Sequence, residues 1–321
     1  METKTSHPQP PYPLHELIRD LADPEFAKFY NQYLLHAPQV HYQPVAASRV
    51  GGKIIPGGTD PIPVGSTIDV QIPRTESSGP PVLVQVLVPP GAPPKPGGWP
   101  VFLWHHGGGW VLGNIDSENN LYTNLCVRAN CVVITTDYQM APENPFPATV
   151  HDAWEALAVG GSSAGGNLAT IMTQKAIGHR LFAERRTTGG CRGFLYQTLV
   201  VPVTDNTETV ETSETYKSYE YTAALPVDKM LWYRRHYLPN ATKWLNPEAS
   251  PLLADKEMFG QLPRALVGEE YAWKLNKGGV HAEVKVVKGV PHCFIVMDRV
   301  LQKGKDEVGF LCDRLAAAFE S

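Results

Sequence analysis

The chain has 321 residues, and its 28 Lys and Arg residues nearly balance its 32 Asp and Glu residues, so the formal net charge is −4. Hydrophobic residues make up 43% of the chain and charged residues 19%, which allows a real core in one large or two small domains and excludes a disordered chain. Without a basic excess the chain lacks the electrostatic footprint of a nucleic-acid-binding protein, so we expect no nucleic-acid partner.

The sequence also lacks the segments that direct proteins to membranes or to secretion. It contains no run of about 18 apolar residues, so we expect no membrane span, and its first residues contain no apolar signal core. The cysteines follow no paired spacing, which indicates neither a disulfide framework nor a zinc site. We therefore expect a cytoplasmic protein with no metal and no cofactor. The cysteines are Cys126, Cys131, Cys191, Cys293 and Cys312.

The chain begins with helical and linker sequence and then alternates between strands and helices. Residues 14–34 carry apolar residues at helical spacing, with Asp23 as an N-cap and Pro24 at the first helical position of a second segment. Residues 35–66 are typical of a linker. The alternation beyond them predicts an α/β fold around a largely parallel sheet. Strands are predicted at Ile68–Ile72, Val82–Val88, Val101–Trp104, Cys131–Thr135, Phe194–Val203, Arg264–Val267 and Ala282–Val287, and helices at Glu118–Ala129, Val227–Tyr237, Glu269–Lys277 and Val300–Phe319.

The sharpest motif is the Gly-x-Ser-x-Gly sequence of residues 161–165, which is followed by Gly166. A nucleophile must protrude from a tight strand-to-helix turn, and small flanking residues allow that strained turn to form. Ser163 is the central residue, and the neighbouring Ser162 would point away. The helix that starts at Ala164 would direct its free N–H groups toward a developing oxyanion. Alone, the motif equally fits a chance Gly-Ser turn.

Two further sequences strengthen this hypothesis. Residues 106–109 read His-Gly-Gly-Gly directly after an apolar run, where backbone N–H groups can approach a substrate closely. His292 lies in a loop after a late strand, which is where the base belongs in the order serine, acid, histidine. At an unperturbed histidine pKa, catalysis would fade below about pH 6–7. A Gly-rich surface turn and a surface histidine are the plain alternatives.

Five stretches together resemble the hormone-sensitive-lipase-like carboxylesterases of the α/β-hydrolase superfamily. They are residues 106–110, 137–143, 161–166, 246–251 and 291–294. The resemblance implies an α/β-hydrolase fold with a mostly parallel sheet flanked by helices. It also implies a helical cap and linker over residues 1–66 and a hydrolase domain over 67–321, with a cap insertion around 205–250.

The same resemblance implies how the site works. Ser163 would be the nucleophile, His292 the base, and the N–H groups of Gly107, Gly108 and Ala164 the oxyanion hole. The substrate would be a small carboxylic ester. Whether the protein forms a homodimer is not indicated by the sequence. An aromatic-rich set would line an acyl pocket or simply belong to the core: Tyr216, Tyr219, Tyr221, Leu225, Met230, Leu231, Trp232 and Tyr233.

The sequence departs from the family pattern at two places. Residues 147–159 are too few for both the usual helix, about 11 residues, and the strand that leads into the serine turn, about 5–6 residues. The segment that carries the family's catalytic aspartate is absent, because Val267 runs directly into Gly268. Glu269 is the nearest substitute, although a glutamate at a helix start is common; Asp255 and Asp298 are more remote candidates.

These departures leave two functions open. One is a serine carboxylesterase weakened by the lack of an acid, since neutralising the acid of such a triad lowers kcat about 10⁴-fold. The other is a small-molecule-binding relative on the same fold, because a fold does not determine an activity. An error in the exon structure assigned to the gene would also produce both gaps.

Overall fold

The structure is a computed structural model that describes residues 7–50, 55–157, 159–180 and 194–320. Within these ranges, eight strands form one sheet in the order β1-β2-β4-β3-β5-β6-β7-β8. β2 pairs antiparallel with both β1 and β4, and the remaining pairings are parallel, which confirms the predicted α/β fold. The strands are β1 (Ser66–Ile72), β2 (Val82–Val88), β3 (Val101–His105), β4 (Val132–Asp137), β5 (Gly160–Ser162), β6 (Tyr196–Val200), β7 (Arg264–Leu266) and β8 (Ala282–Glu283).

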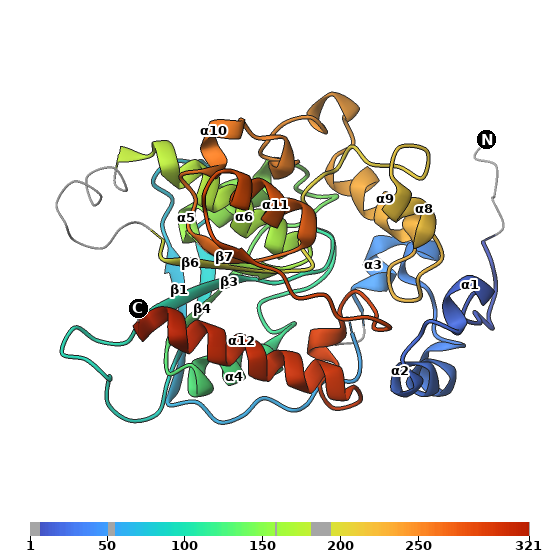
Figure 1. Ribbon diagram of the computed structural model, residues 1–321, viewed down its shortest axis with the longest axis horizontal. Helices are drawn as coiled ribbons and strands as arrows, with labels where there is room; N and C mark the ends of the chain where they lie inside the picture. The colour runs from blue at the N-terminus through green and yellow to red at the C-terminus, as the bar shows by residue number, and fades with distance from the viewer. Residues whose placement is uncertain (1–6, 51–54, 158, 181–193, 321) are drawn as a thin grey trace.

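Helices cover both faces of this sheet (Figure 1). α4 (Asn119–Arg128) and α12 (Gln302–Glu320) pack together on one face, while α5 (Ala148–Ala156), α6 (Ala164–Gly178) and α11 (Glu269–Lys277) lie on the other. A parallel strand covered on both faces buries its side chains in both directions. This explains why the sequence around β4 is almost continuously apolar.

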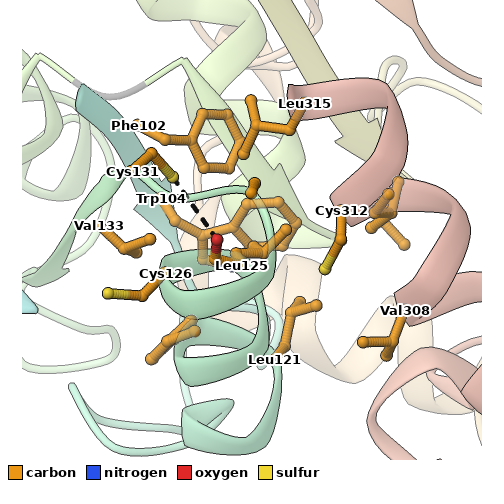
Figure 2. Packing of buried hydrophobic residues seen from close by; sticks show 14 of the residues in the cluster. Phe102, Trp104, Leu121, Leu125, Cys126, Cys131, Val133, Val308, Cys312 and Leu315 are labelled. Carbon is orange, nitrogen blue, oxygen red and sulfur yellow. Dashed lines mark hydrogen bonds between the residues drawn. The ribbon is translucent and has the colours of Figure 1, made fainter. Parts of the chain in front are cut away.

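A large apolar cluster fills the space between the sheet, α4 and α12 (Figure 2). Trp104 of β3 is fully buried there against Leu121 and Leu125 of α4. Cys126, Cys131 and Cys312 belong to the same cluster and are free thiols. Burial raises the pKa of the Cys126 and Cys312 thiols to about 11, so these cysteines behave as small apolar residues. Cys191 lies outside the described residues.

The N-terminal residues form short helices that pack near the end of the sheet that carries Ser163 and His292. α1 (Glu16–Arg19) precedes α2 (Pro24–Phe29), and the predicted N-cap is confirmed because Asp23 accepts a hydrogen bond from the Glu25 N–H at 3.0 Å. The helix continues as the π-helical turn η1 (Tyr30–Leu34). Tyr30 packs against Phe294 and Met297, far along the chain, so this segment is part of the fold.

The region predicted as a linker is more structured than expected, since it contains the 3-10 turn η2 (Val40–Tyr42) and α3 (Val45–Ser48). The mid-chain segment contributes α8 (Glu214–Ser218) and α9 (Val227–Tyr237), which lie beside α3 and the N-terminal helices (Figure 1). In the described residues no helix is long and apolar enough to cross a membrane. The remaining short helices are η3 (Ala241–Lys243), η4 (Pro251–Leu253), α10 (Lys256–Phe259) and η5 (Phe294–Val296).

Both departures from the family pattern have a clear structural form. α5 keeps nine residues and ends at Leu157, which has a left-handed conformation (φ 52°), so the shortage of residues falls on β5, which has only three. β7 is likewise three residues long, and Gly268 directly caps α11. β8 has two residues where six were predicted. The sheet is therefore shortest on the side that carries the serine turn.

Candidate active site

Ser163 occupies a strained turn between β5 and α6. Its backbone has φ 52° and ψ −114°, a conformation that a residue with a side chain rarely adopts and that costs about 1–3 kcal/mol. The Ser163 N–H donates to the Val200 carbonyl at 2.8 Å, which ties the turn to β6. Such strain persists only where the surrounding structure enforces it, and here it lifts the serine hydroxyl away from the strand.

The glycines on either side of Ser163 are required by close packing. A Cβ on Gly161 would lie 2.3 Å from the carbonyl carbon of Gly165, and a Cβ on Gly165 would lie 2.0 Å from the carbonyl oxygen of His105. Both separations are far below contact distance, and the atoms met are backbone atoms that cannot move aside. The Gly-x-Ser-x-Gly motif therefore has a structural cause in this chain.

His292 lies directly against this serine. The Ser163 Oγ and the His292 Nε2 are 2.8 Å apart, although the two residues are 129 positions apart in the chain. Burial, reinforced by the positive charge of Lys229, lowers the pKa of His292 to about 4. The imidazole is consequently neutral at physiological pH, the form that can accept a proton from a hydroxyl.

No carboxylate of the described residues is bonded to His292. Glu269 is exposed in the first turn of α11, while Asp255 is the N-cap of α10. Asp298 is occupied elsewhere, since it accepts hydrogen bonds from the Thr59 N–H at 2.8 Å and from other donors. None of the three candidates is therefore hydrogen-bonded to the histidine, although Glu269 lines a cavity that also borders it.

A cavity of about 250 Å³ lies next to His292, on the side where β7 meets α11. Val267, Gly268 and Glu269 line it, so it borders the junction at which the sequence lacks the expected acid segment. The buried carboxylate of Glu307 also lines it and pairs with Lys285 at 2.6 Å. The space beside the histidine is therefore open and is bordered by a carboxylate that already has a cationic partner.

Glu118 joins the glycine loop (residues 106–109) to the serine turn (residues 161–165), a role that the sequence did not reveal. Its buried carboxylate accepts hydrogen bonds from the Gly107 N–H at 3.1 Å, from the Trp104 Nε1–H at 2.7 Å and from the Ser162 hydroxyl. Burial raises the pKa of Glu118, while the three donors oppose that shift by favouring the ionised form. In the sequence it resembles an ordinary acidic residue at a helix start.

The glycine loop presents its N–H groups unequally. The N–H of Gly107, predicted as an oxyanion donor, is instead donated to Glu118 and is not free for a substrate. The N–H groups of Gly108 (φ 115°) and Gly109 (φ 62°) have no acceptor among the described residues. Ala164 is the first residue of α6, where an N–H has no partner within the helix. Two of the three predicted donors are thus available.

His106 supports this loop from behind. Its ring is buried and stacks on Tyr138 with the ring centroids 4.2 Å apart, and the Tyr138 hydroxyl donates to the His106 carbonyl at 2.7 Å. Its Nδ1 lies 2.6 Å from the Gly107 carbonyl oxygen. Through these contacts His106 stabilises the glycine loop, whereas His292 is the histidine that contacts Ser163.

A cavity of about 270 Å³ opens in front of Ser163 and His292. Its walls come from the glycine loop, the N-terminal helices and the start of α9, and they are mostly apolar. Of the predicted aromatic-rich set, Leu225 and Tyr233 line the cavity, whereas Trp232 is buried in the core and Tyr219 and Tyr221 are exposed. The cavity wall also includes Tyr30, Ala224, Lys229, Tyr233 and Cys293.

Comparison with known proteins identifies the family of this chain. Residues 102–296 match the family described as having the alpha/beta hydrolase fold. The chain is similar to an AB hydrolase superfamily protein of Schizosaccharomyces pombe, with 41% identity over 96% of this chain and 97% of that protein. The chain belongs to the hormone-sensitive-lipase-like carboxylesterases of the α/β-hydrolase superfamily.

Proteins named as ester hydrolases are similar to this chain over most of their length. The ethyl acetate hydrolase of Pseudomonas putida is 28% identical over 66% of this chain and 71% of that protein. The solved structure of an ester hydrolase from the metagenome of Lake Arreo has a TM-score of 0.78 at 25% identity and covers 94% of this chain and all of that chain. The family and these relatives support an ester hydrolase that acts on small-molecule esters.

The comparison also bears on the two departures. The alignment with the S. pombe relative extends over 339 positions, although this chain has only 321 residues. That relative therefore has positions with no counterpart here. The short β5 and the direct junction of β7 with α11 are where the fold itself is abbreviated.

Proposed function

We propose that this protein is a serine carboxylesterase that works through an acyl-enzyme. The observation that carries the proposal is the 2.8 Å contact between the Ser163 Oγ and the neutral His292 Nε2 at a strained turn. His292 would take the hydroxyl proton as Ser163 attacks the ester carbonyl carbon, and would return it to the departing alcohol. Water would then hydrolyse the acyl-enzyme by the same route.

The oxyanion of each tetrahedral intermediate would be stabilised by three backbone N–H groups. We assign this role to Gly108 and Ala164, as the sequence analysis expected, and to Gly109 in place of Gly107. The free N–H groups of Gly108 and Gly109 support the assignment, because a donor already bonded to a carboxylate adds nothing to a developing oxyanion. Losing one such donor costs about 10²–10³ in kcat.

The activity would be low for a member of this family. Among the residues that the structure describes, no carboxylate fixes the orientation of His292 or stabilises its charged form, and the corresponding loss in a complete triad is about 10⁴ in kcat. The oxyanion hole and substrate binding alone still supply about 10³–10⁴ over water. Weak turnover is therefore the expected outcome.

The pKa of His292 and the size of the cavity determine the expected pH range and acyl-chain preference of ester hydrolysis. Because burial lowers the pKa of His292 to about 4, the base stays neutral well below the pH of about 6–7 expected from the sequence alone. The cap-like helices close a cavity of limited size over Ser163, which favours short acyl chains. Butyrate esters should therefore be cleaved faster than laurate esters, with a rate that holds down to about pH 5.

Covalent labelling tests the proposal directly. A fluorophosphonate should modify the parent protein, and Ser163→Ala should abolish both labelling and p-nitrophenyl ester hydrolysis. Ser162→Ala is the matched control, because its hydroxyl donates to Glu118 and points away from His292. It should keep most of the labelling and hydrolysis. A parent protein that binds esters but resists labelling would instead support the small-molecule-binding alternative.

A further inference from the structure

The cavity in front of Ser163 contains a lysine that the proposed reaction does not use. Lys229 lies in the first turn of α9 and lines the cavity together with His292 and Ser163. Its Nζ donates to the Ala224 carbonyl at 2.9 Å and lies 6.0 Å from the centre of the Tyr233 ring. The side chain therefore extends along the wall of the substrate cavity and is half-buried there.

No carboxylate of the described residues pairs with this ammonium group. Glu118, the nearby acid of the cavity wall, is occupied by its three hydrogen-bond donors. The Cys293 thiol is neutral, because burial raises its pKa to about 12, and His292 is neutral as well. An ammonium group has three donors, and the protein supplies one neutral acceptor. Lys229 is thus a charge without a countercharge.

An unpaired charge in an apolar cavity is unfavourable, because desolvation of the ammonium is not repaid by a neutral carbonyl alone. Burial accordingly lowers the pKa of Lys229. A ligand that brings a negative charge would satisfy the two remaining donors and remove this penalty. Burial of the pair in a mostly apolar cavity would also make the charge-assisted hydrogen bond stronger than it is in water.

We propose that Lys229 makes this site selective for esters that carry a carboxylate. The proposal rests on the proposed esterase function and adds the chemical class of its substrate. The uncharged part of such an ester would contact the apolar wall that includes Tyr30 and Tyr233, and its carboxylate would accept hydrogen bonds from the Lys229 Nζ. Lys229 is in this proposal a specificity-determining residue and takes no part in proton transfer.

Pairs of esters that differ only in charge test this selectivity. One pair is the p-nitrophenyl monoester of adipic acid and the isostere whose free carboxylate is replaced by a methyl ketone. The second pair carries the charge on the alcohol side: acetylated para-hydroxybenzoate and its methyl-ketone isostere. In at least one pair the parent protein should prefer the anion in kcat/KM, and Lys229→Met should reduce that preference about 10- to 100-fold.

Two further variants separate charge from structure. Lys229→Arg should keep most of the preference, because a guanidinium also binds a carboxylate. Lys243→Met, at an exposed lysine of η3, should leave both esters unaffected. An equal loss for the charged and neutral esters in Lys229→Met would overturn the proposal, and so would the absence of any preference in both pairs.

A binding measurement keeps this test independent of turnover. In the Ser163→Ala background, calorimetry should show that monoethyl adipate binds more tightly than its methyl-ketone isostere, and Lys229→Met should remove the difference. Equal binding in the presence of Lys229, both for this pair and for acetylated para-hydroxybenzoate and its isostere, would refute selectivity. Lack of Ser163 labelling together with lysine-dependent binding would instead refute the esterase function and leave the carboxylate site standing.

Discussion

Replacement of Glu118 should weaken both the fold and the reaction, because this carboxylate links the glycine loop to the serine turn. Three donors converge on it: the N–H groups of Gly107 and Trp104 and the hydroxyl of Ser162. A hydroxyl can rotate toward another acceptor, but the two N–H groups are fixed and buried. Each buried donor left unpaired costs about 1–3 kcal/mol, so Glu118→Ala should lower the free energy of unfolding by about 2–6 kcal/mol.

A loss of this size is a large part of the about 5–15 kcal/mol that stabilises a typical domain, so Glu118→Ala can fail to fold. Glu118→Gln is the sharper variant, because it keeps the shape and one acceptor oxygen but turns an NH₂ group toward a donor. We expect it to lose about 1–3 kcal/mol of stability. A displaced glycine loop should also lower kcat by up to about 10²-fold, the low end of the effect of losing one oxyanion donor.

Urea unfolding and p-nitrophenyl butyrate hydrolysis measure the two effects on the same preparation. Glu270→Gln is the matched control, since Glu270, like Glu118, is a glutamate at the start of a helix but is exposed. It should stay within about 0.5 kcal/mol of the parent and keep its rate. If Glu118→Gln behaved like this control, Glu118 would not hold the loop and the reasoning would be wrong.

Three other changes have defined outcomes. His105 is fully buried and its pKa is lowered to about 3, so below about pH 6.5 this histidine binds a proton in the unfolded chain but not in the folded protein. Its contribution to the free energy of unfolding should therefore fall by about 1.4 kcal/mol per pH unit, and His105→Leu should reduce the slope seen in urea unfolding by that amount. Insertion of an Asp-bearing segment of family length at the junction 267–268 should raise kcat about 10³–10⁴-fold, and an otherwise identical Asn-bearing insert should not. Gly109→Ala places a Cβ 2.3 Å from the Tyr233 ring at a φ of 62°, so ester hydrolysis should collapse, whereas Gly97→Ala meets no atom within 4 Å and should leave the rate unchanged.

At the abbreviated junction between β7 and α11, the described residues place no carboxylate in hydrogen-bond contact with His292. In a complete triad the acid fixes one tautomer of the histidine and stabilises the imidazolium. Here a cavity adjoins His292, and Glu269 stays exposed on α11. A basal rate that survived Glu269→Gln would agree with this placement, since an exposed helix-start glutamate contributes nothing to the histidine.

The sequence alone was sufficient for the features that depend on local order. The Gly-x-Ser-x-Gly motif predicted the turn at Ser163, and alternating strands and helices predicted the α/β fold. The number of residues in 147–159 indicated one abbreviated segment, and the direct junction of Val267 with Gly268 indicated the other. These predictions succeed because turn geometry, strand burial and chain length are set by neighbouring residues.

The tertiary structure decided those features that no motif indicated and that depend on residues distant in the chain. Only the folded chain shows that Gly107 donates to Glu118 and that Lys229 enters the serine's cavity without a countercharge. It also shows that burial moves the pKa of His292 to about 4. No local sequence pattern indicates these features, because desolvation and charge pairing depend on which surfaces the fold brings together. A lysine or glutamate at the start of a helix usually faces water, and only the tertiary structure shows that these two do not.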